Sequence, residues 1–518
     1  MRRTIRIAVC RAAFLTSAAL AVGCGGGSSA GAPMTGASSG GSGGGGTAAT
    51  GAAGAPASGG APGTGGADLA TGGTTATGGD SGVAGRIGAG GNGGAGHGGA
   101  AGATGGGAGG AVGGASGSDP CASNPAAVPL PSIPAGTFDV KATGATGDGK
   151  TDDTRAVQAA LTAAKNAGGG TVVVPAGTFL CGPLAIGSGT NLQLAAGAVL
   201  KMLPYGTYPS PPPAFITTAG ASHDIAITGA GTIDGQGQAW WDAFAADASV
   251  ARPQEMSLGN TTRVQVSGIR LIDSPEEHIW VKGDTDVTIT GITISTLAVA
   301  GKSPPKNTDG VDVTANGMFF CHNDIAAGDD NIAMSGSNLY IGYSSFGVGH
   351  GCSIGSITKS GVSHVTVDHL TMNGTTSGIR MKSARDRGGL VTDLVYSNVT
   401  MTNVPTPISI TSYYPSLPAD PKADDAVAVT STTPFWQNIT IKNLTATGAT
   451  AAGQLWGLPE ARIANVTLDN VRISASTGMK IFHATGIAFT NGSTITPKSG
   501  PPVTIYDATV SGIATTGL

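Results

Sequence analysis

Residues 264–271 read VQVSGIRL, and residues 287–294 read VTITGITI. Both stretches place apolar residues at their first and third positions and end on an apolar residue seven positions after the first. The pattern recurs through the second half of the chain, with further starts at Met318, Leu339, Val365, Leu394, Ile439 and Val466 and a weaker copy at Ile225. Apolar residues that alternate with a period of 2 predict β-strands.

The repeats follow one another at intervals of 23, 31, 21, 26, 29, 45 and 27 residues from Val264 onward. One short pair of strands per repeat, with connecting loops of variable length, predicts an all-β fold: a single-stranded, right-handed parallel β-helix. A propeller would need a more regular period of about 40 residues or more, and the two-residue hairpins of an antiparallel sandwich are scarce in the sequence. Small or polar residues that tolerate bends interrupt many of the repeats, among them Gly268, Gly291, Asn398, Asn443 and Asn470.

The N-terminal residues have the composition of a targeting segment. Residues 1–23 are predicted to be a signal peptide, because four arginines precede an apolar run, residues 12–22, that is too short to span a bilayer. The segment ends in Leu20-Ala21-Val22-Gly23-Cys24, which resembles a bacterial lipobox with Ala21 in place of the usual Leu. We therefore expect Cys24 to be lipidated; the alternative is an ordinary signal peptide with an incidental cysteine.

The rest of the chain divides into a linker and a folded domain. Residues 24–120 consist almost entirely of Gly, Ala, Ser and Thr, a composition that cannot bury a core and predicts a disordered linker. Residues 121–518 form the predicted β-helix domain, whose length is acceptable because a solenoid grows without a single central core.

A short helix is predicted near the start of this domain. Residues 154–167 are rich in Ala and are followed by three glycines. We expect Asp152 or Asp153 to be the N-cap residue, and the helix to cover the open N-terminal end of the solenoid. A calcium-binding loop is the alternative for this Asp cluster, but the Glu that an EF-hand requires is missing.

Four cysteines lie in the predicted β-helix domain, and in an exported protein they are candidates for disulfides. Cys321 and Cys352 fall in adjacent or next-nearest repeats and form the first expected pair, which leaves Cys121 and Cys181 as the second. A zinc site is not expected, since the sequence contains no Cys-x-x-Cys spacing.

Candidate catalytic residues occur in four short segments: Asn307-Thr308-Asp309, Gly328-Asp329-Asp330, Gly349-His350-Gly351 and Arg380-Met381-Lys382. Asp309 lies 20 residues before Asp329, Asp330 lies 20 before His350, and His350 lies 30 before Arg380. In a solenoid, residues one repeat apart stack on the same face of neighbouring coils. We therefore expect three carboxylates, an imidazole and two cations to meet at one surface site.

The chemistry of these residues suits acid–base catalysis. Asp329 and Asp330 should lie at a bend, because on a regular strand one of them would enter the apolar core. With Asp309 one coil away, the carboxylates should raise at least one pKa and so provide a protonated acid beside an ionised base, as glycosidic hydrolysis requires. Arg380 and Lys382 offer a fork and a point charge to a carboxylate. Each residue alone would be a solvated surface group, but their common spacing favours a site.

The four segments resemble the signature motifs of the polygalacturonases, family 28 of the glycoside hydrolases, in their bacterial form. Met381 stands where the family usually has Ile, and either Tyr413 or Tyr414 matches the family's active-site tyrosine, with the spacing from Ile410 favouring Tyr414. The resemblance covers residues 138–490 and extends through Gly235-Gln236-Gly237, Trp240-Trp241, Ser274-Pro275, residues 353–356 and residues 373–376.

The resemblance implies a pectin-lyase-like β-helix that cleaves the α-1,4-galacturonosyl linkages of polygalacturonan with inversion, with neither a metal nor another cofactor. It assigns the role of general acid to Asp329, and to His350 the role of keeping that acid protonated and in place. The activation of the attacking water falls to Asp309 and Asp330. The residues implied to bind the substrate are Asn307, Arg380, Lys382 and Tyr414.

The overall charge gives no support to a nucleic-acid partner, since the formal net charge is −4 and the isoelectric point is near 6.0. We expect a pectic polysaccharide as the partner, contact with a membrane only through the lipid anchor, and a monomer. The protein would be exported, either as an outer-membrane or cell-surface lipoprotein or in secreted form.

Two other functions compete with a hydrolase. One is a pectate lyase on a similar β-helix, which would need a basic residue as the proton acceptor and usually Ca²⁺ on an Asp cluster; the other is an adhesin that has kept only the fold. The complete set of motifs argues against the adhesin. Within the hydrolase interpretation we expect internal cleavage of the polymer, with the loops 297–306 and 414–436 deciding whether the groove is open.

Overall fold

The computed structural model of the protein describes residue 121 and residues 125–296 and 298–518. The predicted signal peptide (residues 1–23), the predicted lipidation site Cys24 and the predicted linker (residues 24–120) lie outside the described residues. In the described ranges, no helix is both long enough and apolar enough to cross a membrane.

The described part of the chain is built almost entirely of β-strands. Its helices are α1 (Thr154–Asn166), α2 (Gln238–Ala246) and the short 3-10 helix η2 (Pro421–Ala423). The strands before α2 are β1 (Thr137–Asp139), β2 (Asp148–Asp152), β3 (Gly170–Val174), β4 (Gly177–Cys181), β5 (Leu184–Ile186), β6 (Thr190–Leu194), β7 (Ala198–Met202), β8 (Ile216–Thr218), β9 (Ser222–Gly229) and β10 (Thr232–Asp234). The next are β11 (Met256–Gly259), β12 (Thr261–Ser267), β13 (Arg270–Ile272), β14 (Ile279–Thr290), β15 (Thr293–Ser295), β16 (Val311–Cys321), β17 (Asp324–Ala326), β18 (Ile332–Phe346) and β19 (Cys352–Ile354). The last are β20 (Val362–Asn373), β21 (Ser377–Lys382), β22 (Leu390–Thr402), β23 (Thr406–Thr411), β24 (Phe435–Trp456), β25 (Ile463–Thr490), β26 (Thr494–Ser511) and β27 (Thr515–Gly517).

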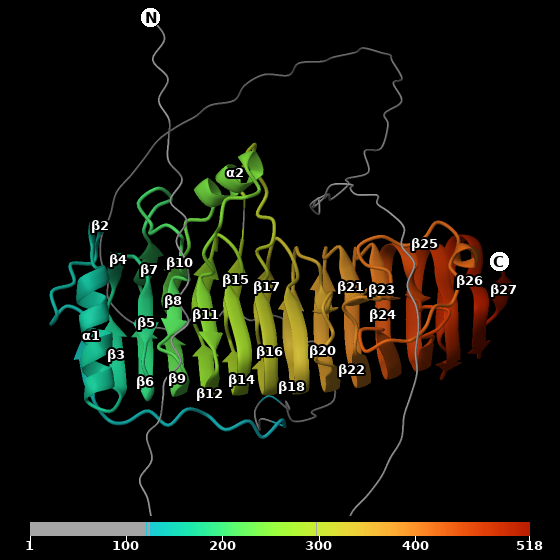
Figure 1. Ribbon diagram of the computed structural model, residues 1–518, viewed down its shortest axis with the longest axis horizontal. Helices are drawn as coiled ribbons and strands as arrows, with labels where there is room; N and C mark the ends of the chain where they lie inside the picture. The colour runs from blue at the N-terminus through green and yellow to red at the C-terminus, as the bar shows by residue number, and fades with distance from the viewer. Residues whose placement is uncertain (1–120, 122–124, 297) are drawn as a thin grey trace, which may run out of the picture. The chain divides into compact units, whose positions relative to one another are not determined.

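Neighbouring strands in the described chain pair in parallel, each with its counterpart one coil further along (Figure 1). The starts of the sequence repeat are register partners of one another. Val264 pairs with Val287, and the same register continues through Met318, Leu339, Val365, Leu394, Ile439 and Val466. The repeat counted in the sequence is therefore the coil of the structure, and the predicted mostly-β, parallel-stranded architecture is confirmed.

The residues that were expected to tolerate bends have positive φ, both between strands and within the longer strands. Gly268 and Gly291 have φ angles of 74° and 64°, and Asn398, Asn443 and Asn470 have φ angles of 55°, 53° and 50°. Gly reaches this left-handed region without strain, and Asn tolerates it better than most residues. The asparagines also form a ladder: Nδ2 of Asn443 donates to Oδ1 of Asn398, and Nδ2 of Asn470 to Oδ1 of Asn443, each at 3.0 Å.

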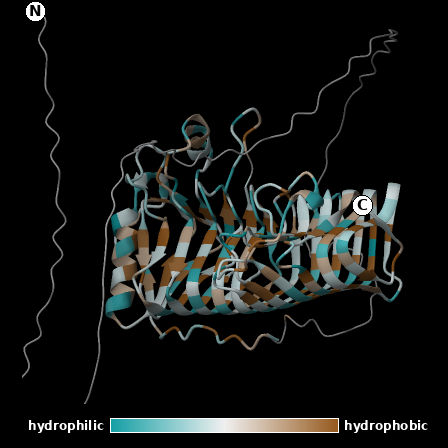
Figure 2. Ribbon diagram, turned by 45° about the vertical axis from the view of Figure 1, so that its right-hand side comes forward, coloured by the Kyte–Doolittle hydropathy of each residue, from teal (hydrophilic) through white to brown (hydrophobic). Residues whose placement is uncertain are grey.

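Alternate residues of each strand point into the coil and pack against those of the neighbouring coils. In β16, Val311, Val313 and Ala315 are buried, whereas Asp312 and Thr314 are partly exposed. Figure 2 shows the resulting mixture of hydrophobic and hydrophilic residues along the strands. Because successive residues face opposite sides, every second residue is available at the outer surface, where neighbouring coils can combine such residues into a site.

α1 packs against the first strands and covers the N-terminal end of the stack, as predicted (Figure 1). Asp153 stands at the N-cap position, but its carboxylate accepts hydrogen bonds from the backbone N–H groups of Thr146 and Gly147, at 2.6 and 2.9 Å. The carboxylate that accepts a bond from the helix start belongs to Asp152, whose Oδ1 lies 3.0 Å from Thr154 N. The two aspartates thus divide the expected capping role.

The predicted disulfide pairing is wrong. Cys121 bonds to Cys321, with their Cα atoms 6.0 Å apart, whereas Cys181 and Cys352 are free and buried. Cys352 cannot reach Cys321 because it is in register with the core residue Ile332, so that its side chain points into the coil. Cys321 belongs to a separate small hydrophobic cluster, against which the segment that contains Cys121 packs.

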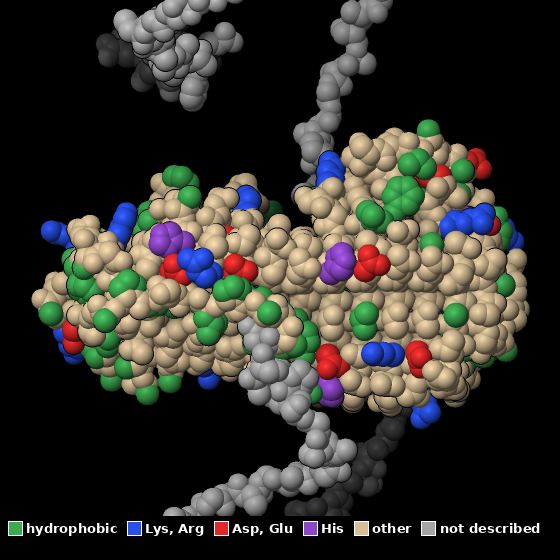
Figure 3. Space-filling view, turned by 90° about the horizontal axis from the view of Figure 1, so that it is seen from below, with side chains coloured by type: hydrophobic (Ala, Val, Ile, Leu, Met, Phe, Trp, Pro, Cys, Tyr) green, Lys and Arg blue, Asp and Glu red, His purple; other side chains and the backbone are tan. Residues whose placement is uncertain are grey.

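Charged side chains are sparse on the face drawn in Figure 3, and they lie in small, separate groups. Lys, Arg, Asp and Glu together make up 11% of the chain. The face drawn therefore lacks the continuous basic surface that typically binds nucleic acid.

Candidate active site

The candidate catalytic residues lie just before the strands of one ladder. Asp309, Asp330 and His350 each stand two positions before the first residue of β16, β18 and β19, respectively. The first residues of these strands are register partners in neighbouring coils. The three side chains therefore occupy equivalent positions in successive coils, as the repeat spacing predicted.

Arg380 and Lys382 come from β21, which lies one coil beyond β19. Arg380 is in register with Ser353 of β19. Met381, between the two cations, points into the core and is fully buried. Because side chains alternate along a strand, Arg380 and Lys382 share the outer face on which the aspartates lie.

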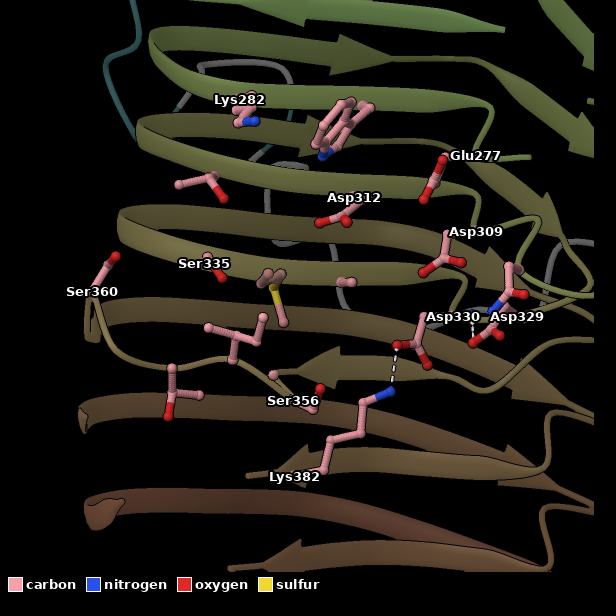
Figure 4. A pocket seen from close by; sticks show the side chains of 18 of the residues that line it. Glu277, Lys282, Asp309, Asp312, Asp329, Asp330, Ser335, Ser356, Ser360 and Lys382 are labelled. Atoms are coloured by element: carbon pink, nitrogen blue, oxygen red, sulfur yellow. Dashed lines mark hydrogen bonds and ion pairs between the residues drawn. The ribbon is translucent and has the colours of Figure 1, made fainter. Parts of the chain in front are cut away.

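Asp330 accepts most of the hydrogen bonds in the site. Its Oδ1 accepts from Ser353 Oγ at 2.7 Å and from Arg380 Nη1 at 2.6 Å. Its Oδ2 accepts from Lys382 Nζ at 2.9 Å (Figure 4). Only 3% of the Asp330 side chain is exposed, so these charge-assisted bonds offset the cost of burying its carboxylate. Both cations expected to bind substrate are thus paired with Asp330 in the free protein.

Asp329 lies next to His350. His350 Nδ1 is 2.8 Å from Asp329 Oδ1 and 3.9 Å from Asp330 Oδ1. Burial acts to raise the pKa of Asp329, but the hydrogen bond to His350 and the charges of His350, Lys382 and Arg380 together leave it below its usual value. This direction is opposite to the expectation that His350 keeps Asp329 protonated in the free protein.

Asp309 has the opposite electrostatic environment. Burial, together with the negative charges of Asp329 and Asp330 nearby, raises the pKa of Asp309 well above its usual value. The expectation that the carboxylates would raise at least one pKa is therefore confirmed, but the raised pKa belongs to Asp309. In the free protein, the cluster combines a carboxyl that holds its proton with one that readily loses it.

Two acidic residues that the sequence interpretation missed lie beside this cluster. Asp312 and Glu277 line the same cavity as Asp309. Burial, with the charges of Glu277 and Asp330, raises the pKa of Asp312 to about 7, and burial also raises the pKa of Glu277. Asp312 could have been found from the alternation of β16, which turns it outward three residues after Asp309.

Asn331 holds the turns that carry the catalytic residues. Its Nδ2 donates to the carbonyl oxygens of Ile325 and Val348, at 2.9 and 3.0 Å, and its Oδ1 accepts from Gly351 N at 2.8 Å. A Cβ atom at position 349 would overlap the Asn331 side chain, so Gly349 is required for this close approach. One fully buried amide thus fixes the turn of Asp330 relative to that of His350 in the next coil.

Thr308 and His278 support Asp309. Thr308 Oγ1 donates to the Pro305 carbonyl at 2.8 Å and accepts from Gly328 N at 3.0 Å, which joins the first two motif segments. His278 is fully buried, and its Nδ1 lies 3.2 Å from the carbonyl oxygen of Asp309. Burial lowers the pKa of His278 to about 4, so the ring is neutral and orients the Asp309 backbone.

The predicted site residues line one cavity of about 450 Å³. Lys382 Nζ lies 5.4 Å from the centroid of the Tyr414 ring, whereas the Tyr413 hydroxyl bonds to Asp424 outside the cavity. The structure therefore places Tyr414, and not Tyr413, at the site. The predicted residues in the lining are Asn307, Asp309, Asp329, Asp330, Lys382 and Tyr414, and His350 and Arg380 join them through Asp329 and Asp330.

The same cavity extends to residues that belong to none of the sequence motifs. Trp280 and Lys282 belong to β14, one coil before Asp312, and Trp280 is in register with Asp312. They are two positions apart and share the outer face of the strand. Their spacing of two residues was visible in the sequence, but only the register shows which coil they border.

Asp329, Asp330 and His350 place possible metal-binding atoms within 4.8 Å of one another. The donor set suits a cation poorly, because Arg380 and Lys382 already occupy the Asp330 carboxylate and would repel a divalent ion. We therefore keep the expectation that neither a metal nor another cofactor takes part.

The arrangement can transfer protons on both sides of a bond. Among the carboxyl groups that border the cavity, Asp309 has a raised pKa and Asp329 a lowered one, and the cations that neutralise Asp330 can also attract an anionic ligand. Such a set suits the displacement of an acetal leaving group by water, which needs one proton donor and one proton acceptor.

Comparison with known families agrees with this chemistry. The family described as glycosyl hydrolases family 28 matches residues 131–493. An endo-polygalacturonase of Pectobacterium carotovorum subsp. carotovorum is 32% identical over 375 residues, which cover 65% of this chain and 88% of that protein. A polygalacturonase of Ralstonia solanacearum is 30% identical over 346 residues, covering 56% of this chain and 63% of that protein.

Two solved structures show the same fold. A polygalacturonase from Erwinia carotovora ssp. carotovora superposes with a TM-score of 0.54 and 28% identity, covering 76% of this chain and 98% of that one. A family 28 exopolygalacturonase from Yersinia enterocolitica superposes with a TM-score of 0.58 and 21% identity, covering 74% of this chain and 78% of that one.

The environment of Asp329 predicts the effect of removing His350. Because the hydrogen bond and charge of His350 lower the pKa of Asp329, His350→Ala should raise that pKa and move the acidic limb of the kcat/KM profile to higher pH. The measurement is the pH dependence of initial rates on polygalacturonate for the wild type, His350→Ala and the control His364→Ala, a histidine on another ladder. An acidic limb that stays in place or moves to lower pH would contradict the role given to His350.

Proposed function

The chain belongs to family 28 of the glycosyl hydrolases, and from its site we propose that it hydrolyses the α-1,4-galacturonosyl linkages of polygalacturonan, the demethylated form of pectin. The observation that carries the proposal is the cavity that brings Asp309, Asp329 and Asp330 together beside Arg380 and Lys382. The relatives named polygalacturonases support the substrate.

We also infer that the strands form one right-handed parallel β-helix. The support is the parallel register that continues from coil to coil and the strong preference of parallel crossovers for the right hand. In this architecture the cavity lies across the outer faces of neighbouring coils, where a long polymer can pass.

Substrate recognition would depend on the uronate charge. Arg380 and Lys382 point into the site from one strand, and a galacturonate carboxylate bound there would receive charge-assisted hydrogen bonds. Tyr414, next to Lys382, offers an aromatic face, and Asn307, which also lines the cavity, offers an amide. A neutral or esterified sugar would lose the charge that these cations recognise.

Binding of such a carboxylate would also move a proton. The charges of Arg380 and Lys382 help to hold the pKa of Asp329 down in the free protein. A bound uronate partly neutralises both cations and adds a negative charge of its own, so the pKa of Asp329 should rise. The proton that Asp309 holds in the free protein would then pass to Asp329, which makes Asp329 the general acid only when substrate is present.

The reaction would then proceed as a single displacement with inversion. Asp329 gives its proton to the leaving glycosidic oxygen while the bond from that oxygen to the anomeric carbon breaks. A water molecule forms the new bond to the anomeric carbon and loses a proton to Asp309, with Asp330 accepting a hydrogen bond from the water. The cycle ends with Asp309 protonated and Asp329 ionised, which is the distribution favoured by the free protein.

We propose internal cleavage of the polymer. The Pectobacterium relative is named an endo-polygalacturonase, and the match to this chain covers 88% of that protein. The loop after Tyr414 is fixed by Arg385, which bonds Asp424 at 2.6 and 3.0 Å and Glu460 at 2.7 and 3.1 Å. These ion pairs hold in place the loop that follows Tyr414, a residue of the cavity lining.

We further propose that the protein is exported and works as a monomer, anchored through a lipid on Cys24 or secreted. The support is the sequence of residues 1–23, the lipobox-like segment and the Gly-rich linker up to residue 120. A polymer of the cell wall is accessible only to an enzyme outside the cytoplasm, so export agrees with the proposed substrate.

One assay tests the reaction. The full protein is incubated with polygalacturonate in the presence of EDTA, and new reducing ends and ultraviolet absorbance are both followed. Hydrolysis predicts reducing ends without new absorbance, because no unsaturated sugar forms. New absorbance would indicate a lyase, and the absence of reducing ends would leave only a binding function.

A substitution tests the acid. Asp329→Asn preserves the shape of the side chain but cannot supply a carboxyl proton, so kcat should fall by at least about 10²-fold. Asp324→Asn is the matched control, since Asp324 is exposed in the same coil and outside the cavity. Near-normal kcat in the folded Asp329→Asn variant would assign the acid elsewhere.

A second substitution tests the anchor. Cys24→Ser removes the only thiol of the lipobox-like segment and should release the protein from the membrane fraction, because a Gly-rich linker has no membrane affinity. The readout is the distribution of the protein between membrane and soluble fractions in its host. Unchanged dependence on detergent in the variant would exclude lipidation at Cys24.

A further inference from the structure

Lys282 and Lys382 lie at opposite ends of the described cavity (Figure 4). Both point outward from one ladder of strands. Lys282 is in register with Thr314, and Thr314 with Ser335. Met334, the residue before Ser335, pairs with Ile354 of β19, and Ile354 pairs with Met381, the residue before Lys382 in β21. Four coil steps of about 4.8 Å each place the two lysines about 19 Å apart along the groove.

The two lysines differ in how they are held. Lys382 Nζ bonds to Asp330 Oδ2 at 2.9 Å, whereas Lys282 Nζ lies 4.7 Å from the centroid of the Trp280 ring. Among the described residues, no carboxylate oxygen lies within 4.0 Å of Lys282 Nζ. An aromatic face positions a cation without cancelling its charge, so the exposed Lys282 remains able to bind an anion.

The lining between the lysines changes in character along the groove. Asp312 lies on β16 in the same coil as Asp309, and Glu277 stands two residues before β14; both line the cavity and repel an anionic polymer when ionised. Thr314 and Ser335 present hydroxyl groups in the row that leads from Lys282 toward Lys382. Lys282, at the far end of the cavity, offsets this repulsion where the polymer passes beyond Asp312 and Glu277.

The groove does not end at Lys282. A second hollow, of about 570 Å³, adjoins the first, and Trp280 and Lys282 line both. Its remaining lining comes from the two preceding coils and is uncharged, with Ser257 and Asn260 among the polar residues. Trp280 and Lys282 thus stand in the middle of a longer path and are not a terminal wall.

We propose that Lys282, held over the ring of Trp280, forms a second uronate-binding subsite, which takes the carboxylate of a galacturonate unit several sugars away from the bond that is cleaved. The proposal rests on the proposed function and deepens it. The subsite makes binding depend on the number of charged sugars that occupy the groove. It contributes equally to the ground state and the transition state, because it lies far from the reacting bond.

Chain length provides the test. Lys282→Met should raise KM for polygalacturonate by about 5-fold, as expected for the loss of one partly exposed ion pair, and should leave kcat unchanged. The galacturonate trimer, bound at the catalytic cations, does not span about 19 Å, so its KM should be the same for the variant and the wild type. Lys282→Arg should restore binding of the polymer.

The control is Lys442→Met, which makes the same change in charge at an exposed residue of β24 outside both hollows. A rise in KM that is confined to the polymer and absent from the Lys442→Met variant supports the subsite. An unchanged KM for the polymer, or an equal rise for polymer and trimer, overturns it. Failure of the proposed function is distinguishable, because then the wild type and every variant would leave polygalacturonate intact.

Discussion

The catalytic aspartates, His350 and the two cations of the site reach their places through the parallel register between neighbouring coils. Asp309, Asp330 and His350 stand at equivalent positions before β16, β18 and β19, and a slip of one residue would turn the outward rows into the core. The buried Asn331 amide adds a direct connection between these turns. The register therefore fixes which charges meet, and the electrostatics of the cavity follow from it.

Much of this arrangement could be predicted from the sequence, because the coil is a local repeat. The starts from Val264 to Val466 are register partners, and the bends at residues such as Gly268 and Asn443 have positive φ, which Gly and Asn tolerate better than most residues. The four motif segments came together for the same reason: one repeat in sequence is one coil in space. The disordered linker expected over residues 24–120 and the lipidation of Cys24 remain predictions.

Other features depended on directions that spacing alone does not give. Cys352 lies near Cys321 in sequence but points into the core, and the true partner, Cys121, comes from a segment without any repeat. The sequence also does not predict which carboxyl holds a proton. The pKa of Asp309 rises because this group is buried, and the pKa of Asp329 falls because of its contact with His350. Lys282 carried no motif, and its role follows only from its place on the groove.

The central claim is that a bound uronate raises the pKa of Asp329 by neutralising Arg380 and Lys382. Carbon NMR of the protein labelled at its aspartate carboxyls, with Asp329→Asn to assign the signal, measures this pKa directly. We predict a pKa below the usual range in the free protein and a higher value in the presence of saturating galacturonate dimer. A pKa of Asp329 that is unchanged or lower with the dimer bound would contradict the claim.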